Sequence, residues 1–159
     1  MTPSEIIEVL KQHDGAGIVS AVADGLHPHV VVKMDRLPAI AALLQSDWRL
    51  RFDLLRCLSA IDWPAKNSIE LSYDVISTSF GHALAVKVLL DRANPQVESV
   101  SVVWPAAEGH EREAFDLMGV TFLHHPDLRR ILLPEDWTDH PLRKDYPYPV
   151  AYKGLKLNP

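Results

Sequence analysis

The sequence contains a single cysteine, Cys57, among its 159 residues. One cysteine cannot form a disulfide within the chain, and so low a count fits a protein of a reducing compartment. Iron–sulfur clusters usually take a set of thiolates, and structural zinc takes several closely spaced Cys or His ligands. We therefore expect this chain to hold no iron–sulfur cluster and no structural zinc of its own.

Long apolar runs are also missing. No stretch approaches the roughly 18 apolar residues that indicate a membrane-spanning helix. The smoothest stretches, residues 39–44 and 83–90, suit a folded core. The first residues show no basic region ahead of an apolar one, so the pattern predicts no secretory signal. We expect any contact with a membrane to be made through other proteins.

Positive charge is scarce relative to negative charge. The chain has 16 Lys and Arg against 21 Asp and Glu, which gives a formal net charge of -5. A mildly acidic chain does not attract phosphate backbones as a whole, so we expect no nucleic-acid partner. With 47% apolar and 23% charged residues, the composition is that of one globular domain.

Motifs for nucleophilic and nucleotide chemistry are absent too. There is no Gly-x-Ser-x-Gly elbow and no phosphate-binding P-loop. The segment Gly15-Ala-Gly17 follows a predicted helix rather than a strand, so we do not interpret it as a dinucleotide loop. Cys57 lies in an apolar stripe and is expected to be a small core residue. The sequence therefore predicts neither an independent nucleophile nor an NADH site.

Histidines supply the one alternative with chemistry of its own. Half of the eight lie between positions 110 and 140, among many carboxylates. His110-Glu111 begins like the His-Glu-x-x-His helix of zinc proteases, but position 114 is alanine. His124 and His125 are adjacent and would point in different directions on regular structure. A metal-dependent hydrolase that uses Asp127 or Asp136 beside these imidazoles stays the enzymatic alternative.

The spacing of apolar residues predicts a mixture of helices and strands. Ser4 is expected to cap the first helix, and Glu111 and Glu113 are expected in the first turn of the last one. Helices are predicted over 4–14, 37–44, 54–61 and 111–118, and strands over 18–23, 30–33, 69–75 and 84–90. Residues 97–103 fit either structure, and 129–133 fit a short strand or an extended segment. This order predicts an α+β fold, a single domain with a small, mostly antiparallel sheet packed by helices.

The C-terminal segment differs in composition from the rest of the chain. Residues 134–159 contain five prolines, one tryptophan and three of the four tyrosines. Proline favours extended backbone, and Tyr and Trp are common anchors of interfaces. We divide the chain into an α+β domain, 1–133, and an extended docking arm, 134–159. The arm packs either on its own domain or on another protein.

Charged residues gather in and after the last predicted helix, without the spacing of a catalytic site. The helix carries Glu111, Arg112, Glu113 and Asp116, and the later positive charges are Arg129, Arg130, Arg143 and Lys144. Arginine binds carboxylates in a fixed fork and is favoured in buried pairs. These residues form either a polar lattice or a solvated face. Arg92, by contrast, is expected on a surface turn.

Three blocks resemble the 30-kilodalton subunit family of respiratory complex I, whose bacterial members are known as the C subunit. They are Glu-Arg-Glu-Ala-Phe-Asp-Leu-Met-Gly at 111–119, His-Pro-Asp-Leu-Arg-Arg-Ile-Leu at 125–132 and His-Pro-Leu-Arg-Lys-Asp-Tyr-Pro at 140–147. Many members of that family have glycine where this chain has His124 and Asp139. If those glycines supply a positive φ, the two turns are expected to differ here.

The resemblance implies a scaffold subunit of NADH:quinone oxidoreductase in its hydrophilic arm, peripheral on the cytoplasmic side of the bacterial inner membrane. It implies packing against the D subunit and contact with the B subunit, with FMN and Fe–S clusters held by other subunits. The equivalent scaffold of a membrane-bound hydrogenase or related dehydrogenase, and a free-standing interaction module, stay as alternatives. The residues expected to fix the loops are Glu111, Arg112, Glu113, Asp116, His125, Pro126, Arg129 and Arg130. The residues expected to dock on the partner are Pro141, Leu142, Arg143, Lys144, Asp145 and Tyr146.

Overall fold

A five-stranded sheet forms the centre of the molecule in a computed structural model that describes residues 1–157. Its strands are β1 (Ile18–Val22), β2 (His29–Val32), β3 (Leu54–Trp63), β4 (Ser68–Ile76) and β5 (Ala83–Asp91), in the spatial order β1-β2-β5-β4-β3. Within this sheet only the β2–β5 pair is parallel, because the chain crosses over between these strands through a helix and the β3–β4 hairpin. The predicted α+β class is confirmed.

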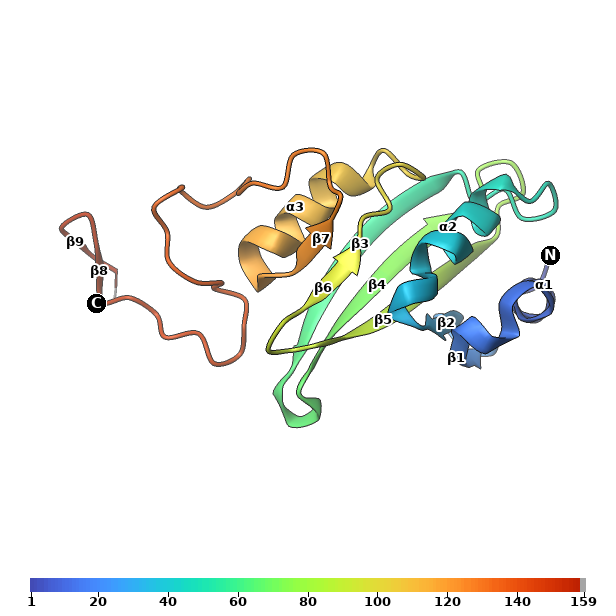
Figure 1. The fold of residues 1–159 in the computed structure, drawn as a ribbon, viewed down its shortest axis with the longest axis horizontal. Coiled ribbons are helices and arrows are strands. Elements are labelled where there is room, and N and C mark those ends of the chain that lie inside the picture. Colours follow the sequence, from blue (N-terminus) through green and yellow to red (C-terminus); the bar gives the residue numbers. More distant parts are fainter. Residues whose placement is uncertain (158–159) are drawn as a thin grey trace.

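Three α-helices pack on this sheet (Figure 1). They are α1 (Pro3–Asp14), α2 (Leu37–Ser46) and α3 (Ala107–Met118). Short pairs are formed by β6 (Gln96–Glu98) with β7 (Thr121–Leu123) and by β8 (Ala151–Tyr152) with β9 (Leu155–Lys156). The helix α3 lies against β3, at the end of the sheet nearer the C-terminal arm and away from α1. None of the described helices is long and apolar enough to cross a membrane.

The two faces of the sheet differ because its strands alternate apolar and polar residues. On β4, Leu71 and Tyr73 are fully buried under the helices, whereas Glu70 and Ser72 are partly exposed. Glu70 forms a 2.8 Å ion pair with Lys87 of β5 on that outer face. The sheet therefore has one dry face, which holds the core, and one wet face.

The third predicted helix is wrong, because residues 54–63 form β3. A β-bulge lies between Leu55 and Cys57, so Leu55 pairs with Val75 and Leu58 pairs with Tyr73. The extra residue brings two leucines three positions apart onto the same buried face, which imitates helical spacing. The prediction that Cys57 is a core residue depends on that helix and is also wrong, because the side chain is half-exposed.

Two helices begin earlier than predicted. Thr2, not Ser4, caps α1, since Thr2 Oγ1 accepts from Glu5 N at 3.3 Å and Glu5 Oε2 accepts from Thr2 N at 2.8 Å. The helix α3 starts at Ala107, so its first turn holds Glu108 rather than Glu111. This shift places Glu111 in the middle of the helix, on the side that faces the core.

Two turns expected to differ from the family, at His124 and Asp139, have left-handed backbone here. His124 has φ 59° and Asp139 has φ 61°. Both are non-glycine residues in the left-handed region, which costs L-residues roughly 1–2 kcal/mol. These turns therefore have a backbone that glycine adopts readily, and the expectation that they differ from the turns of the family stays a prediction.

Asp139→Gly is expected to be more stable than Asp139→Ala by about 1 kcal/mol, since the two variants differ only in the Cβ that left-handed backbone disfavours. The side chain of Asp139 forms no hydrogen bond or ion pair within residues 1–157. Both variants therefore lose the same small contribution of the carboxylate to the free energy of unfolding. Urea unfolding of the two proteins measures the difference. Equal stabilities would contradict the assigned backbone conformation.

Candidate assembly surface

A buried carboxylate near the end of α3 organises the segment that follows β7. The side chain of Asp116 has no exposed surface, and its Oδ2 accepts from the backbone N of Ile131, Leu132 and Leu133 at 3.0, 2.8 and 2.9 Å. Its Oδ1 accepts from Arg130 Nη1 at 2.7 Å. Burial acts to raise the pKa of Asp116, but these hydrogen bonds outweigh burial and hold the pKa below its usual value.

Two arginines extend this cluster to the start of the arm. Arg130 Nη2 donates to the carbonyl oxygens of Trp137 at 3.0 Å and Asp139 at 3.2 Å. Arg112 donates to the carbonyl oxygens of Arg129 and Arg130, both at 3.1 Å. Because these acceptors are backbone atoms, the arginines fix the path of the chain from 129 to 139 rather than one side chain.

Glu111 does not join that cluster. Its carboxylate is buried and accepts from Ser99 Oγ at 2.6 Å and from Val100 N at 2.8 Å, so it holds the loop that precedes α3. Burial raises the pKa of Glu111, although these two hydrogen bonds oppose the shift. Glu111 thus orders the loop before α3, and Asp116 orders the segment that comes later in the chain.

The side chain of His125 is buried beside Glu111 and links the same loops. Its Nδ1 accepts from Asp127 N at 3.0 Å, which places the ring proton on Nε2, where it donates to the carbonyl oxygen of Glu108 at 3.1 Å. The imidazole is thus committed at both nitrogens to backbone groups. The remaining predicted lattice residues are exposed: Glu113 and Pro126 have no side-chain hydrogen bond within residues 1–157, and Arg129 pairs with Asp127 on the surface.

The predicted docking run folds back on its own domain. Leu142 N donates to the carbonyl oxygen of Leu117 at 3.1 Å, and Arg143 Nε donates to the carbonyl oxygen of Met118 at 2.8 Å. Lys144 N donates to Asp62 Oδ2 at 2.9 Å. The backbone from 142 to 144 is therefore held by α3 and by the end of β3, whereas the side chain of Leu142 stays exposed.

The prediction that Arg92 lies on a solvated surface turn is wrong. Its guanidinium donates to both oxygens of Asp62, at 2.7 and 2.9 Å, and to Asp145 at 2.6 Å. The side chain of Asp62 has no exposed surface, and that of Arg92 is 16% exposed. The hydrogen bonds from Arg92 are the main cause of a lowered pKa at Asp62. Sequence reasoning missed this pair, which joins β3, the end of β5 and the arm.

The rest of the arm extends away from the domain (Figure 1) and exposes apolar side chains. Its β8–β9 hairpin packs on Trp137 through Tyr152, with 5.0 Å between ring centroids, and Tyr152 also donates to Asp136 at 2.6 Å. The exposed apolar residues along the arm and the segment before it are Ile131, Leu132, Leu142, Tyr148, Val150, Leu155 and Leu157. A row of exposed apolar and aromatic side chains is typical of a surface that another protein covers.

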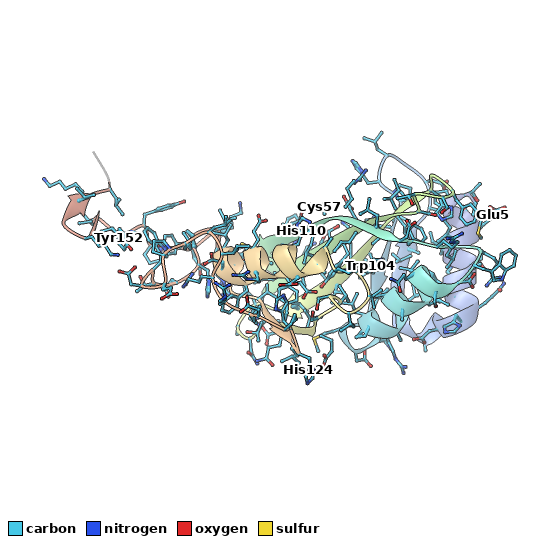
Figure 2. The ribbon with its side chains drawn as sticks, turned by 90° about the horizontal axis from the view of Figure 1, so that it is seen from above. Glu5, Cys57, Trp104, His110, His124 and Tyr152 are labelled. Atoms are coloured by element: carbon cyan, nitrogen blue, oxygen red, sulfur yellow. The ribbon has the colours of Figure 1, made fainter. Side chains whose placement is uncertain are left out.

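The histidines do not gather into a metal site. His124 pairs with Glu98, His140 binds the carbonyl oxygen of Asp116, and His110 lies at a groove beside β3. Figure 2 shows His110 and His124 on opposite sides of the domain. Within residues 1–157 no three His, Cys, Asp or Glu residues lie close enough together to hold a metal ion. The arrangement gives the hydrolase alternative no support.

His124 is expected to titrate above its usual pKa because of Glu98. The 2.8 Å hydrogen bond and the charge of Glu98 favour the imidazolium, so the folded pKa exceeds the unfolded one. The stabilisation of the folded state by this pair is fully present below the unfolded-state pKa of His124. It is lost as the pH rises through the folded-state pKa. An NMR titration is expected to show the His124 pKa falling in Glu98→Gln. An unchanged pKa would contradict the contact.

The sequence matches the profile of the respiratory-chain NADH dehydrogenase 30 kDa subunit over residues 30–151. The chain belongs to this family. It is 47% identical over 119 residues to the C subunit of NADH-quinone oxidoreductase from Moorella thermoacetica, with 75% of this chain and 79% of the relative covered. It is 39% identical over 151 residues to the C subunit from Chloroherpeton thalassium, with 94% of this chain and 62% of the relative covered. The chain thus spans less than two thirds of that relative.

Two solved structures share the fold of this chain. A chain of an archaeal membrane-bound sulfane sulfur reductase, a respiratory membrane complex, superposes with a TM-score of 0.74 at 25% identity, over 90% of this chain and 86% of that chain. The trypsin-resistant fragment of Nqo5 superposes with a TM-score of 0.61 at 23% identity, over 77% and 98%. The second likeness is one of fold alone.

Proposed function

We propose that this chain is a structural subunit of a proton-translocating NADH:quinone oxidoreductase and that it holds no cofactor. It packs in the hydrophilic arm of the complex against the quinone-site D subunit and touches the B subunit, on the cytoplasmic side of the bacterial inner membrane. The complex as a whole passes electrons from NADH through FMN and Fe–S clusters to quinone. This chain contributes shape and binding surface, and no step of the chemistry.

The observation that carries this proposal is the way the arm is built. Asp116 and Asp62, both buried, hold the backbone of the arm and of the segment before it by hydrogen bonds from within the chain, while the apolar side chains of the arm remain exposed. A segment that is ordered by its own domain loses little conformational freedom on binding. An arm of this kind is suited to dock on a neighbouring subunit without folding first.

A second candidate function has one specific observation in its favour. The higher of the two TM-scores belongs to a chain of a sulfane sulfur reductase and not to an NADH-linked complex. The equivalent scaffold in a membrane-bound hydrogenase or related dehydrogenase would use the same arm with a different electron donor. The proteins recovered with the chain from its native membrane distinguish the two candidates.

The arm is tested by substitutions that leave its internal contacts in place. Val150 and Leu155 are 73% and 70% exposed, so Val150→Asp with Leu155→Asp changes only the outer surface of the arm. The variant is expressed in a strain that lacks the native chain. The amount of assembled complex and the NADH:quinone activity of the membranes are expected to be at least fivefold lower than with the unsubstituted chain. Val102→Asp, at a site 88% exposed on the domain, is the matched control and is expected to change neither. Equal effects of the two variants would contradict the docking arm.

Removal of the arm from Pro134 onward is expected to leave a folded domain that no longer assembles. The domain keeps its sheet and core, because the buried apolar cluster lies within residues 6–122. Circular dichroism checks the fold and co-purification checks assembly. A truncated chain that assembles as well as the full chain would exclude a docking role for the arm. Stoichiometric FMN or iron in the purified full chain would contradict the cofactor-free role.

A further inference from the structure

The strand β3 forms one edge of the five-stranded sheet and has a free side. It pairs only with β4, and within residues 1–157 no backbone hydrogen bond reaches its outer side. Sheet edges are usually protected by lysine, proline or a bulge. The β3 bulge lies at Leu55/Cys57, and the stretch from Cys57 to Ile61 carries neither charge nor proline. This stretch of edge is therefore open to another extended chain.

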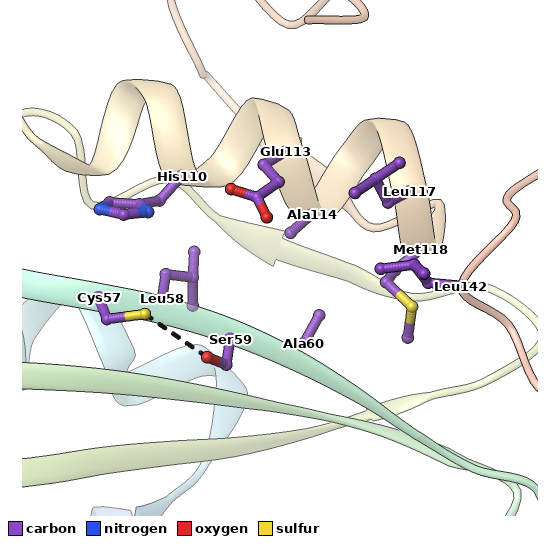
Figure 3. A pocket seen from close by; sticks show the side chains of 10 residues that line it. All are labelled: Cys57, Leu58, Ser59, Ala60, His110, Glu113, Ala114, Leu117, Met118 and Leu142. Carbon is purple, nitrogen blue, oxygen red and sulfur yellow. Dashed lines mark hydrogen bonds between the residues drawn. The ribbon is translucent and has the colours of Figure 1, made fainter. Parts of the chain in front are cut away.

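A groove runs between this edge and the helix α3 (Figure 3). It has a volume of about 300 Å³ and is floored by residues 57–60 of β3. The helix contributes His110, Glu113, Ala114, Leu117 and Met118, which recur at helical spacing and so share one face. A free edge strand with a helix alongside is the arrangement that binds extended peptides by strand addition.

The polar groups of the groove indicate the chemistry of its occupant. Figure 3 shows Glu113 on the face of α3 that borders the groove, and its carboxylate has no hydrogen bond or ion pair within the described chain. Apart from the imidazole of His110, the other side chains of the groove, such as Leu58, Ala60 and Leu117, are apolar or small. An extended segment with one Lys or Arg between small apolar side chains complements this lining in charge and in size.

The groove is also continuous with the arm. Leu142 lines its end, and the N–H of the same residue donates to Leu117 of α3. The next residues of the arm close the end of the β3 edge, where Lys144 N binds Asp62. A partner that covers the exposed arm therefore meets the open end of the groove at Leu142.

We propose that an extended segment of a partner subunit lies in this groove, adds to β3 as a further strand and pairs a basic side chain with Glu113. The proposal rests on the proposed function, because it requires that the chain is assembled with other subunits. Backbone hydrogen bonds to residues 57–61 supply affinity, and the Glu113 pair sets the register of the added strand.

Cys57 allows the occupancy of the groove to be measured, because the only cysteine of the sequence lies in its floor. A maleimide is expected to react with Cys57 at least tenfold more slowly in the chain purified with its partner subunits than in the isolated chain. A benzophenone maleimide attached to Cys57 before assembly is expected to cross-link to one extended segment that contains Lys or Arg, identified by mass spectrometry. The reference site is Leu89→Cys in a Cys57→Ser background, on the wet face of the sheet.

Charge reversal tests the pair. Glu113→Lys is expected to lower the affinity for the partner subunits at least tenfold, and Glu113→Gln is expected to have an intermediate effect. Glu108→Lys is the matched control, since Glu108 is an exposed acid on α3 outside the groove. It is expected to change the affinity less than twofold.

Three results would contradict the binding of a partner segment in the groove while leaving the scaffold role intact. They are equal reactivity of Cys57 in the isolated and assembled chain, equal effects of Glu113→Lys and Glu108→Lys, and protection of Cys57 by a small molecule with no cross-linked protein segment. A chain that recovers no partner subunits at all overturns the proposed function and the groove together.

Discussion

Asp116→Ala is expected to lower the free energy of unfolding by about 3–5 kcal/mol. The substitution leaves the Arg130 guanidinium without its anion and strips three backbone N–H groups of their acceptor. Those donors are partly buried, so water replaces the carboxylate only if the segment 130–133 moves away from α3. Chemical unfolding monitored by circular dichroism measures the loss, and hydrogen exchange at 131–133 locates it.

Lowering the pH is expected to destabilise the protein through the same carboxylate, that of Asp116. The pKa of Asp116 is lower in the folded protein than in the unfolded chain. The stability that its carboxylate supplies is therefore fully present above the unfolded-state pKa and is lost as the pH falls through the folded-state pKa. Asp127→Ala is the control, because the side chain of Asp127 is 44% exposed and its surface pairs contribute about 0–1 kcal/mol. Equal losses at positions 116 and 127 would show that Asp116 is not the centre of the cluster.

Asp62→Ala is expected to have the second largest effect, a loss of about 3 kcal/mol together with release of the arm. Asp62 binds Arg92 through both oxygens and also accepts from Lys144 N, so its removal leaves a partly buried arginine beside an arm that has lost one anchor. The expected signature is a rise in limited proteolysis near residues 141–147 at temperatures where the sheet is intact.

Asp62→Asn separates charge from shape at this position. The amide keeps one acceptor oxygen for Lys144 N but cannot neutralise Arg92, so we expect stability between that of the native chain and that of Asp62→Ala. Proteolysis of the arm that is unchanged in Asp62→Ala would contradict its role as an anchor. The assembly assay then shows whether a loosened arm still docks.

Most of the fold was predictable because its strands and helices carry clear periodicity. Alternation over 69–75 and 84–90 predicts β4 and β5, and a bulge is the reason that the same method fails for β3. The leucines at 55 and 58 have helical spacing in the sequence, yet they share a face of a strand through one extra residue. A bulge is set by pairing with β4, which local spacing does not record.

The charged residues of the site were predictable as a group, but their partners were not. Asp116 and Arg130 are 14 positions apart and meet because the chain turns after β7, at the left-handed backbone of His124. Asp62 lies on β3 and Arg92 follows β5, two strands that β4 separates in the sheet, and neither residue lies in a recognisable motif. An acid at an inward-facing strand position is the signal that marks Asp62, and it is readable only once β3 is known to be a strand.

Affinity purification of the tagged full chain from its native membranes, in mild detergent and followed by mass spectrometry, tests the proposed function most directly. We expect recovery of the B and D subunits together with the NADH-oxidising subunits, in a stable stoichiometry with this chain. Recovery with hydrogenase or sulfur-reductase subunits would support the scaffold role but show that the complex uses an electron donor other than NADH. A chain that purifies alone from the soluble fraction would contradict the scaffold role itself.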